Sequence, residues 1–248
     1  MKLAFVSDIH EDLHSLSKAL RMIEKMNCDI VICLGDISGY GVPYFNHFES
    51  RNASECFRLI QSHCEIILGG NHDLAAARVI PKINGGFDYP SNWYDLDYHQ
   101  KKKLSKSAVW LYEQEELDPL YTSDEKAIVA QLSEYAILNT EKFNILTSHY
   151  VYPNVTGSRS GFFYDREDFE FHFEFMKKQD CLMSFSGHEH PYGFVKVTHY
   201  VLNQFGFERV LLRPERTSII VPAIASGKKP NGFLIFDTEN LEIQAVKL

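Results

Sequence analysis

Histidine, aspartate and asparagine residues follow directly after five apolar segments of this chain. The apolar segments cover residues 3–7, 30–34, 65–68, 143–148 and 181–186. The polar residues that follow them are Asp8, His10, Asp36, Asn71, His72, Asp73, His149, His188 and His190. In open α/β sheets, ligands bind beyond the carboxyl ends of the strands. We therefore expect these residues to form one site, assembled from most of the chain.

Most of these side chains offer the nitrogen and oxygen donors that metal ions bind. The candidate ligands are Asp8, His10, Asp36, Asn71, His149, His188 and His190. They exceed the needs of one four- to six-coordinate ion and suit two ions if one carboxylate bridges them. Because no thiolate is among them, they favour Mn²⁺, Fe, Zn²⁺, Co²⁺ or Ni²⁺ at an open catalytic centre over a closed structural zinc site.

Each candidate also has an ordinary structural interpretation. Asp36 could cap a helix, Asn71 could occupy a turn, and His149 could be a hydrogen-bonded core residue. Asp8 and His10 lie two residues apart, as do His188 and His190, and such pairs arise often by chance. Extended backbone would, however, point both members of a pair to the same side. The joint occurrence at successive strand ends favours the metal interpretation.

Two neighbouring divalent ions perform a recognisable kind of chemistry. Ions about 3.5–4 Å apart clamp the attacking and leaving oxygens of an in-line displacement. They also lower the pKa of bound water, so a bridging hydroxide is available near neutral pH. A phosphoester is the natural substrate of such a centre. His72 exceeds the ligand count and could stabilise or protonate the leaving group, with Asp73 orienting its ring. The structural alternative is that His72 only caps a helix.

Composition limits the partners of the protein. The 248 residues carry a net charge of −8, which disfavours sequence-independent binding to nucleic acids. No apolar stretch approaches the roughly 18 residues of a membrane span, and no signal peptide is expected. The five cysteines form no C-x-x-C pair, which is typical of reduced thiols in a cytoplasmic protein. The oligomeric state stays open.

The periodicity predicts an α/β fold in one continuous domain over residues 1–248. The first half alternates strands with helices, whereas residues from 134 onward are mainly strands, so two packed sheets with outer helices fit better than one doubly wound sheet. Helices are expected over residues 13–26, 54–63, 100–116, 123–131 and 166–178. The later strands are expected over residues 134–138, 142–147, 181–186, 193–199, 206–213, 217–221, 231–237 and 241–247.

Two segments, residues 80–131 and 151–165, are candidate lids over the site, because binding walls are commonly built from loops on a rigid scaffold. The stretch 80–98 holds five aromatic residues, Phe87, Tyr89, Trp93, Tyr94 and Tyr98. They could form a satellite core, or they could wall the site and stack a flat group of the substrate.

In its motifs, the sequence resembles the calcineurin-like metallophosphoesterase superfamily, and especially its small prokaryotic members. The family pattern appears in order as Asp8-Ile9-His10, Gly35-Asp36, Gly70-Asn71-His72-Asp73, His149 and Gly187-His188-Glu189-His190. The resemblance implies a four-layer α/β/β/α sandwich with two packed mixed sheets and a dinuclear metal centre. It implies that Asp8, His10, Asp36 and His190 hold one metal and that Asp36, Asn71, His149 and His188 hold the other. His72 would be the catalytic histidine.

Some motifs of the wider superfamily are absent. The protein serine/threonine phosphatases carry an arginine shortly after their G-D motif, whereas Asp36 is followed by Ile37-Ser38-Gly39-Tyr40-Gly41. The expected activity is therefore metal-dependent hydrolysis of a small phosphomonoester or phosphodiester, with a nucleotide as one candidate. The alternatives are a dinucleoside polyphosphate hydrolase and a non-catalytic scaffold of the same fold.

Overall fold

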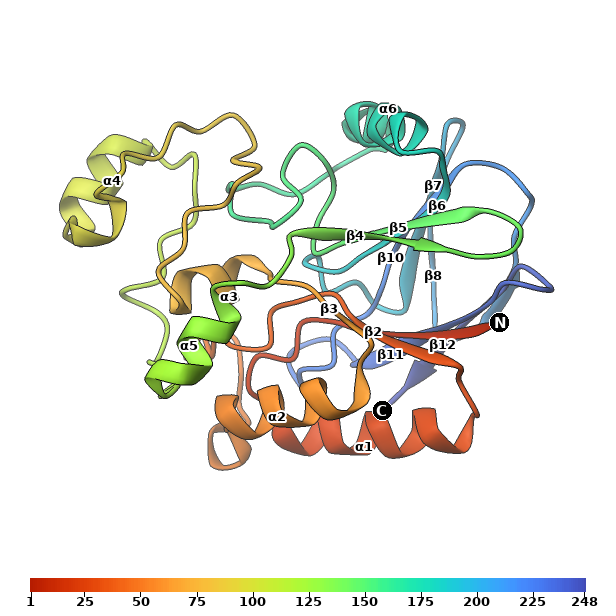
Figure 1. Ribbon diagram of the computed structural model, residues 1–248, viewed down its shortest axis with the longest axis horizontal. Helices are drawn as coiled ribbons and strands as arrows, with labels where there is room; N and C mark the ends of the chain where they lie inside the picture. The colour runs from red at the N-terminus through yellow and green to blue at the C-terminus, as the bar shows by residue number, and fades with distance from the viewer.

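Two six-stranded sheets stack face to face in the computed structural model, which describes residues 1–248 (Figure 1). The first sheet has the order β3 (Ile66–Ile67), β2 (Ile30–Cys33), β1 (Lys2–Val6), β11 (Gly232–Asp237), β12 (Glu242–Lys247) and β9 (Arg209–Leu211). The second has the order β4 (Tyr135–Asn139), β5 (Asn144–Ser148), β6 (Cys181–Ser186), β10 (Thr217–Ile220), β7 (Phe194–Thr198) and β8 (Leu202–Phe205). Both sheets mix parallel and antiparallel pairs.

Helices cover the outer faces of both sheets. α1 (Leu13–Lys25) and α2 (Ala53–His63) lie beneath the first sheet in Figure 1, and α6 (Glu170–Lys178) lies above the second. The expected layer order, α/β/β/α, is confirmed. The remaining helices are short: α3 (Asn71–Ala76), α4 (Tyr98–Ser105) and α5 (Ser123–Val129). None of the helices is long and apolar enough to cross a membrane.

Strand β1 shows how the apolar pattern produces the layers. Successive side chains of a strand point to opposite faces, so Leu3 and Phe5 pack between the two sheets, whereas Ala4 and Val6 pack toward α1 and α2. The rings of Phe5 and Phe185 stack across the sheet interface with centroids 4.0 Å apart. Because β1 is buried on both faces, its carboxyl end is held rigidly.

Two expected elements differ from the structure. The helix expected over residues 100–116 ends at Ser105, because Lys106 adopts a left-handed conformation (φ +47°) that stops the helix. The strand expected over residues 206–213 is present only as β9, and the preceding strand β8, which was not expected, belongs to the other sheet. Gly206, Phe207 and Glu208 lie between them. Alternating apolar residues predict strands but not the point at which the chain leaves one sheet for the other.

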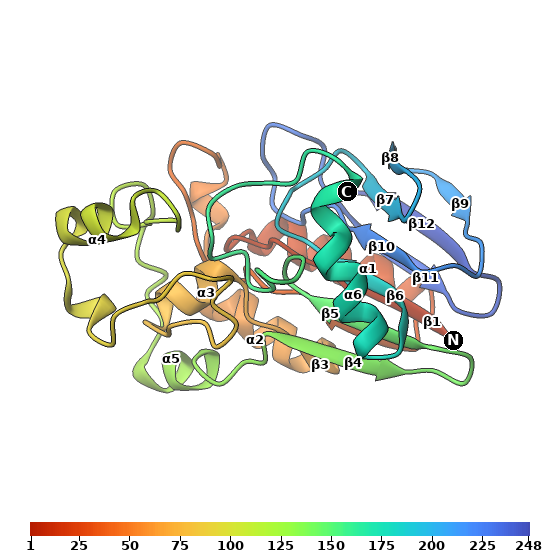
Figure 2. The same ribbon diagram turned by 90° about the horizontal axis from the view of Figure 1, so that it is seen from above.

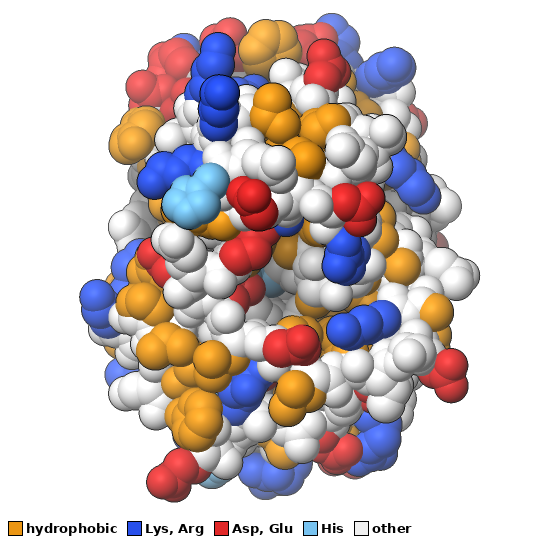
Figure 3. Space-filling model, turned by 90° about the vertical axis from the view of Figure 1, so that its left-hand side faces the viewer, with side chains coloured by type: hydrophobic (Ala, Val, Ile, Leu, Met, Phe, Trp, Pro, Cys, Tyr) orange, Lys and Arg blue, Asp and Glu red, His pale blue; other side chains and the backbone are white.

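The long segment between α3 and β4 extends away from the sheets, with α4 at its far end (Figures 1 and 2). Within it, the rings of Phe87, Tyr89 and Trp93 pack edge to face with centroids 4.7–5.7 Å apart. These three aromatics pack as the satellite core that was one of the two interpretations of the stretch. Tyr89, Trp93, Tyr94 and Tyr98 also line a second cavity of about 530 Å³, which Asn71 and Glu116 border, so the stretch lies beside the site as well. The face of the molecule on this side is hollowed near its centre (Figure 3).

Candidate metal centre

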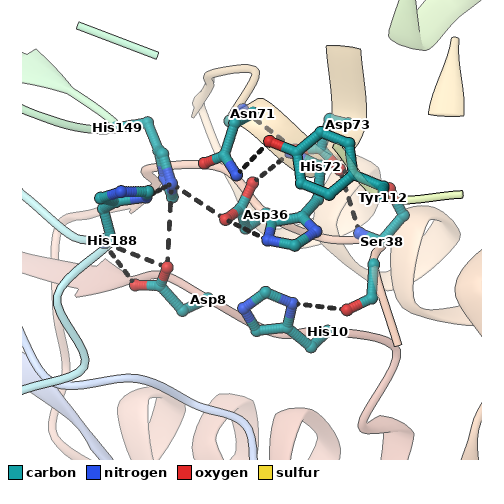
Figure 4. A network of polar contacts seen from close by, with 12 residues as sticks. Asp8, His10, Asp36, Ser38, Asn71, His72, Asp73, Tyr112, His149 and His188 are labelled. Atoms are coloured by element: carbon teal, nitrogen blue, oxygen red, sulfur yellow. Dashed lines mark hydrogen bonds and ion pairs between the residues drawn. The ribbon is translucent and has the colours of Figure 1, made fainter. Parts of the chain in front are cut away.

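The carboxyl ends of five strands meet at one edge of the sandwich, and the sequence-predicted site residues lie there together. Figure 4 labels all of these residues except His190. β1 and β2 deliver Asp8 and Asp36 from the first sheet, and β3 leads to Asn71 at the start of α3. β5 and β6 deliver His149 and His188 from the second sheet. The centre thus spans both sheets.

Several of these residues adopt a backbone conformation that is rare for side chains other than glycine. The φ angles are +55° at Asp8, +45° at His10, +54° at Asp36, +70° at His188 and +45° at His190. Such strain costs about 1–3 kcal/mol per residue and persists only where the surroundings fix it. Its concentration here indicates a site shaped for function at the expense of local stability.

Asp8, His10 and His190 form the first group of candidate ligands. Their ligand atoms all lie within 4.8 Å of one another. Nε2 of His190 is 3.2 Å from Oδ1 of Asp8 and 3.2 Å from Nε2 of His10. This matches the set that the resemblance assigns to one metal, apart from the shared Asp36.

Asp36, His149 and His188 form the second group, also within 4.8 Å of one another. Nε2 of His149 is 3.0 Å from Oδ2 of Asp36 and 3.3 Å from Nδ1 of His188. Asp36 also forms a group with His10 and His72, so its carboxylate lies between the two sets. Asn71 has a buried Oδ1 without a hydrogen-bond partner, while its Nδ2 donates to the hydroxyl of Tyr112 at 2.9 Å.

The hydrogen bonds of the histidines show that these groups suit a cation. Nδ1 of His10 donates to the carbonyl of Gly39 at 2.8 Å, and Nδ1 of His149 donates to the carbonyl of Leu34 at 3.1 Å. A carbonyl accepts only, so in the neutral ring Nε2 carries the lone pair. That lone pair faces Asp36 in the case of His149. Acceptors that face one another in a buried site require a proton or a metal ion between them.

Electrostatics give most candidate ligands the protonation state that metals need. Burial raises the pKa of Asp8, but His190 and His149 more than offset this and hold it well below the usual value. Asp36 behaves in the same way beside His149 and His72. Burial lowers the pKa of His188 to about 3. Carboxylates that stay ionised and an imidazole that stays neutral are the forms that coordinate metal.

His149 is the exception. Burial lowers its pKa, but the charge of Asp36 and the hydrogen bond to it raise the value to about 9. Below that pH a proton occupies the position between His149 and Asp36. A metal ion at this position would have to displace that proton.

His72 projects toward the same centre from the first turn of α3. Its Nε2 is 3.8 Å from Oδ2 of Asp36, and its backbone N–H donates to Oδ1 of Asp36 at 2.9 Å. Its Nδ1 lies 2.5 Å from Oε1 of Glu116. Burial lowers the pKa of His72, but Glu116 and Asp36 raise it to about 10. At neutral pH the ring is therefore protonated on both nitrogens and positively charged.

Glu116 is a site residue that sequence reasoning missed. It was expected on a helix, whereas it lies in an irregular segment joined to Gly41 by an isolated β-bridge and to Tyr40 by the N–H of Leu117. No local pattern marks it. The sequence could have indicated Glu116 only through its acidic side chain and its position in a segment predicted as a lid.

Asp73 does not make the contact expected of it. Its buried carboxylate accepts hydrogen bonds from the backbone N–H groups of Ile37, Ser38 and Gly70 and from the hydroxyl of Ser38, at 3.0–3.1 Å. The expectation that Asp73 orients the His72 ring is therefore wrong, because Glu116 makes that contact. Asp73 instead ties the loop after β2 to the start of α3.

The absence of a side chain at Gly39 leaves room for the ring of His72. The φ of Gly39 is +97°, and a Cβ atom built there would lie 2.4 Å from Nδ1 of His72. That distance is far below van der Waals contact, so a larger residue would displace either the loop or the ring. A glycine at position 39 is thus required by close approach as well as by its backbone angle.

A cleft of about 600 Å³ opens beside the two groups. His10, Asp36, Asn71, His72, His188 and His190 contribute to its floor, and residues 110–112, 115–116, 162 and 227–231 form walls. The predicted lid segments therefore reach the cleft through Trp110, Tyr112 and Phe162. The aromatic stretch 80–98 contributes nothing to this cleft, and the loop at 227–231, which was not predicted as a wall, does.

Comparison with known proteins gives a family match. The family model of the calcineurin-like phosphoesterases matches residues 1–192. The uncharacterized protein MJ0912 of Methanocaldococcus jannaschii is 37% identical over 71 residues. This stretch covers 29% of the present chain and 26% of the relative, so the chain matches about a quarter of that protein's length.

Two solved structures have a similar fold. A metallophosphoesterase from Sphaerobacter thermophilus matches with a TM-score of 0.65 and 16% identity, covering 100% of this chain and 88% of the other. The hypothetical protein PH1004 from Pyrococcus horikoshii matches with a TM-score of 0.61 and 14% identity, covering 100% and 87%. At these identities the similarity concerns the fold.

Proposed function

The chain belongs to the calcineurin-like phosphoesterase family, and from this premise we propose that it is a metal-dependent hydrolase of a small phosphoester. Asp8, His10 and His190 would hold one ion. His149, His188 and Asn71 would hold a second, and Asp36 would serve both. When bound, the ions supply Lewis-acid stabilisation of phosphoryl charge and a nucleophile at neutral pH.

One observation carries this proposal. Two groups of acceptors, all buried except the half-buried His190, face one another around the carboxylate of Asp36. Protons can fill only some of the positions between these acceptors, because burial keeps His10 and His188 neutral. Two cations would satisfy all of the acceptors. The family match supports the same conclusion independently.

His72 supplies the proton chemistry in this proposal. Its ring carries a proton, reaches the centre through Nε2 and is held at Nδ1 by Glu116. A protonated imidazole beside a phosphoryl group donates a hydrogen bond to it or a proton to the departing oxygen. General acid catalysis of this kind contributes typically about 10²–10⁴-fold.

The test combines turnover with metal analysis. The protein is stripped with a chelator and reconstituted with Mn²⁺, and hydrolysis of bis(p-nitrophenyl) phosphate and p-nitrophenyl phosphate is measured before and after. We expect activity only with metal. Asp36→Asn should lose both ions and all activity, because the bridging charge is removed. Asp95→Asn is the control, since that side chain is 78% exposed and remote from the centre.

Two results would overturn the proposal. One is full activity in the stripped protein. The other is Asp36→Asn that keeps both ions by elemental analysis and still turns over either substrate. A non-catalytic scaffold would bind the ions and hydrolyse neither compound, so the same experiment separates the two functions.

A further inference from the structure

The cleft beside the candidate centre has an aromatic wall that metal binding and proton transfer do not explain. Trp110 and Phe162 line it with ring centroids 5.7 Å apart. The ring of Phe162 also lies 5.7 Å from the ring of His188, so the wall adjoins the second group of candidate ligands. Phe162 is 47% exposed, which leaves aromatic surface open to a ligand.

The backbone holds this wall in place. The N–H of Trp110 donates to the carbonyl of Ser158, and the N–H of Ser160 donates to the carbonyl of Ala108, both at 3.1 Å. These bonds pair two segments that are far apart in the sequence. A stacking surface fixed in advance binds a flat ligand with little loss of side-chain freedom.

The charges of the cleft limit the rest of the ligand. Lys228 and Lys229 line it, and Nζ of Lys229 donates to the carbonyl of His190 at 3.0 Å. Glu115, Glu116 and Glu189 line it as well. With more carboxylates than lysines, the walls do not suit a long polyanion. They suit a ligand with one phosphoryl group at the centre and an otherwise neutral body.

We propose that the substrate carries a flat aromatic ring, of the nucleoside monophosphate class, and that this ring stacks on Trp110 and Phe162 while its phosphoryl group lies at the candidate metal centre. This inference rests on the proposed phosphoesterase function and specifies its substrate. The cleft volume of about 600 Å³ falls within the roughly 300–1,000 Å³ of small-molecule sites.

The test measures binding rather than turnover. The ligands are the non-hydrolysable phosphonate analogues of AMP and of ribose 5-phosphate, which differ in carrying adenine or a hydroxyl group at C1′. They are titrated into Mn²⁺-loaded protein and followed by tryptophan fluorescence and calorimetry. Stacking of one base predicts that the AMP analogue binds about five- to 150-fold more tightly. Since the chain has two tryptophans and Trp93 is only 4% exposed, quenching should report Trp110.

Three variants sharpen the result. Trp110→Leu should abolish the preference for the AMP analogue and leave binding of the ribose analogue unchanged. Phe162→Leu should reduce the same preference, and its exposed position makes it a safe second variant should Trp110→Leu fail to fold. Trp93→Phe, in the satellite core, should change neither affinity and should preserve the quenching.

The outcomes separate this inference from the function on which it rests. Equal affinities for the two analogues, or a preference that survives both wall substitutions, would overturn the aromatic subsite. If the chromogenic diester is still hydrolysed, the phosphoesterase function stands. A clear preference in a protein that hydrolyses no phosphoester would overturn that function and leave the aromatic subsite as a binding site.

Discussion

Glu116 gives His72 its charge and its orientation. The two side chains meet at 2.5 Å, and Glu116 is the largest of the influences that raise the pKa of His72 against the effect of burial. A histidine that keeps its proton up to about pH 10 can act as a donor throughout the physiological range. His72 thus differs from the candidate ligand His188, whose pKa burial lowers to about 3, because Glu116 and Asp36 keep the His72 ring positively charged at neutral pH.

Replacing Glu116 by glutamine should uncouple this pair without touching a candidate ligand. With the negative charge gone, the pKa of His72 should fall toward its ordinary value, so the basic limb of the kcat–pH profile should move to lower pH. The metal content should stay unchanged. The measurement is kcat against pH for a substrate with a poor leaving group, with elemental analysis of the same samples.

Glu115→Gln is the matched control for this prediction. Glu115 is the neighbouring exposed residue, and its carboxylate accepts from the hydroxyl of Tyr44 at the rim of the cleft. Glu115→Gln should leave the kcat–pH profile unchanged. A Glu116→Gln enzyme with an unshifted basic limb would remove Glu116 from the mechanism.

At the scale of elements, the loops after the strands are held by buried carboxylates. Asp73, in α3, accepts from the loop after β2, and Glu11 accepts from the N–H groups of Gly39 and Tyr40 at 3.1 and 3.3 Å. Glu11 is in turn paired with Arg51, Nε to Oε2 at 2.5 Å. The strained residues of the site are therefore supported by a second set of charged groups behind them.

Asp73→Asn should destabilise the protein more than it damages the chemistry. An amide has one acceptor oxygen where the carboxylate has two, and its NH₂ group would face backbone donors. Leaving buried donors unpaired costs about 1–3 kcal/mol. We expect a clear fall in the thermal midpoint, with kcat changed little in the fraction that stays folded and metal-loaded. A fall in kcat at unchanged stability would instead give Asp73 a catalytic role.

The sequence predicts the elements and the cluster of candidate ligands because both depend on local order. Asp8, Asp36 and His149 each follow their own strand, so predicting the strand places the residue. Glu116 and Lys229 are different, since they reach the cleft through contacts with distant parts of the chain. The end of α4 at Ser105 depends on one left-handed residue, Lys106, which apolar periodicity does not mark.

At the scale of the whole molecule, the centre joins the two sheets. Asp8 and Asp36 extend from the first sheet, and His149 and His188 extend from the second. Ions bound between them would cross-link the sandwich at its edge. Because the unfolded chain scatters these residues from position 8 to position 190, metal would bind the folded state preferentially and stabilise it.

This cross-link should depend on pH, and the sign follows from His149. Its pKa in the folded protein, about 9, lies above its ordinary value of 6.5. The stability that its proton contributes is therefore fully present below pH 6.5 and is lost as pH rises through 9. Metal has to displace that proton, so its apparent affinity should rise about tenfold for each pH unit across this window.

Chelated protein should lose thermal stability between about pH 6.5 and pH 9, whereas Mn²⁺-loaded protein should retain it. The increment in the thermal midpoint on adding Mn²⁺ should thus grow with pH, and in His149→Gln, which has no proton to displace, this growth should shrink. An increment of the same size at both ends of the window would contradict a metal ion between His149 and Asp36.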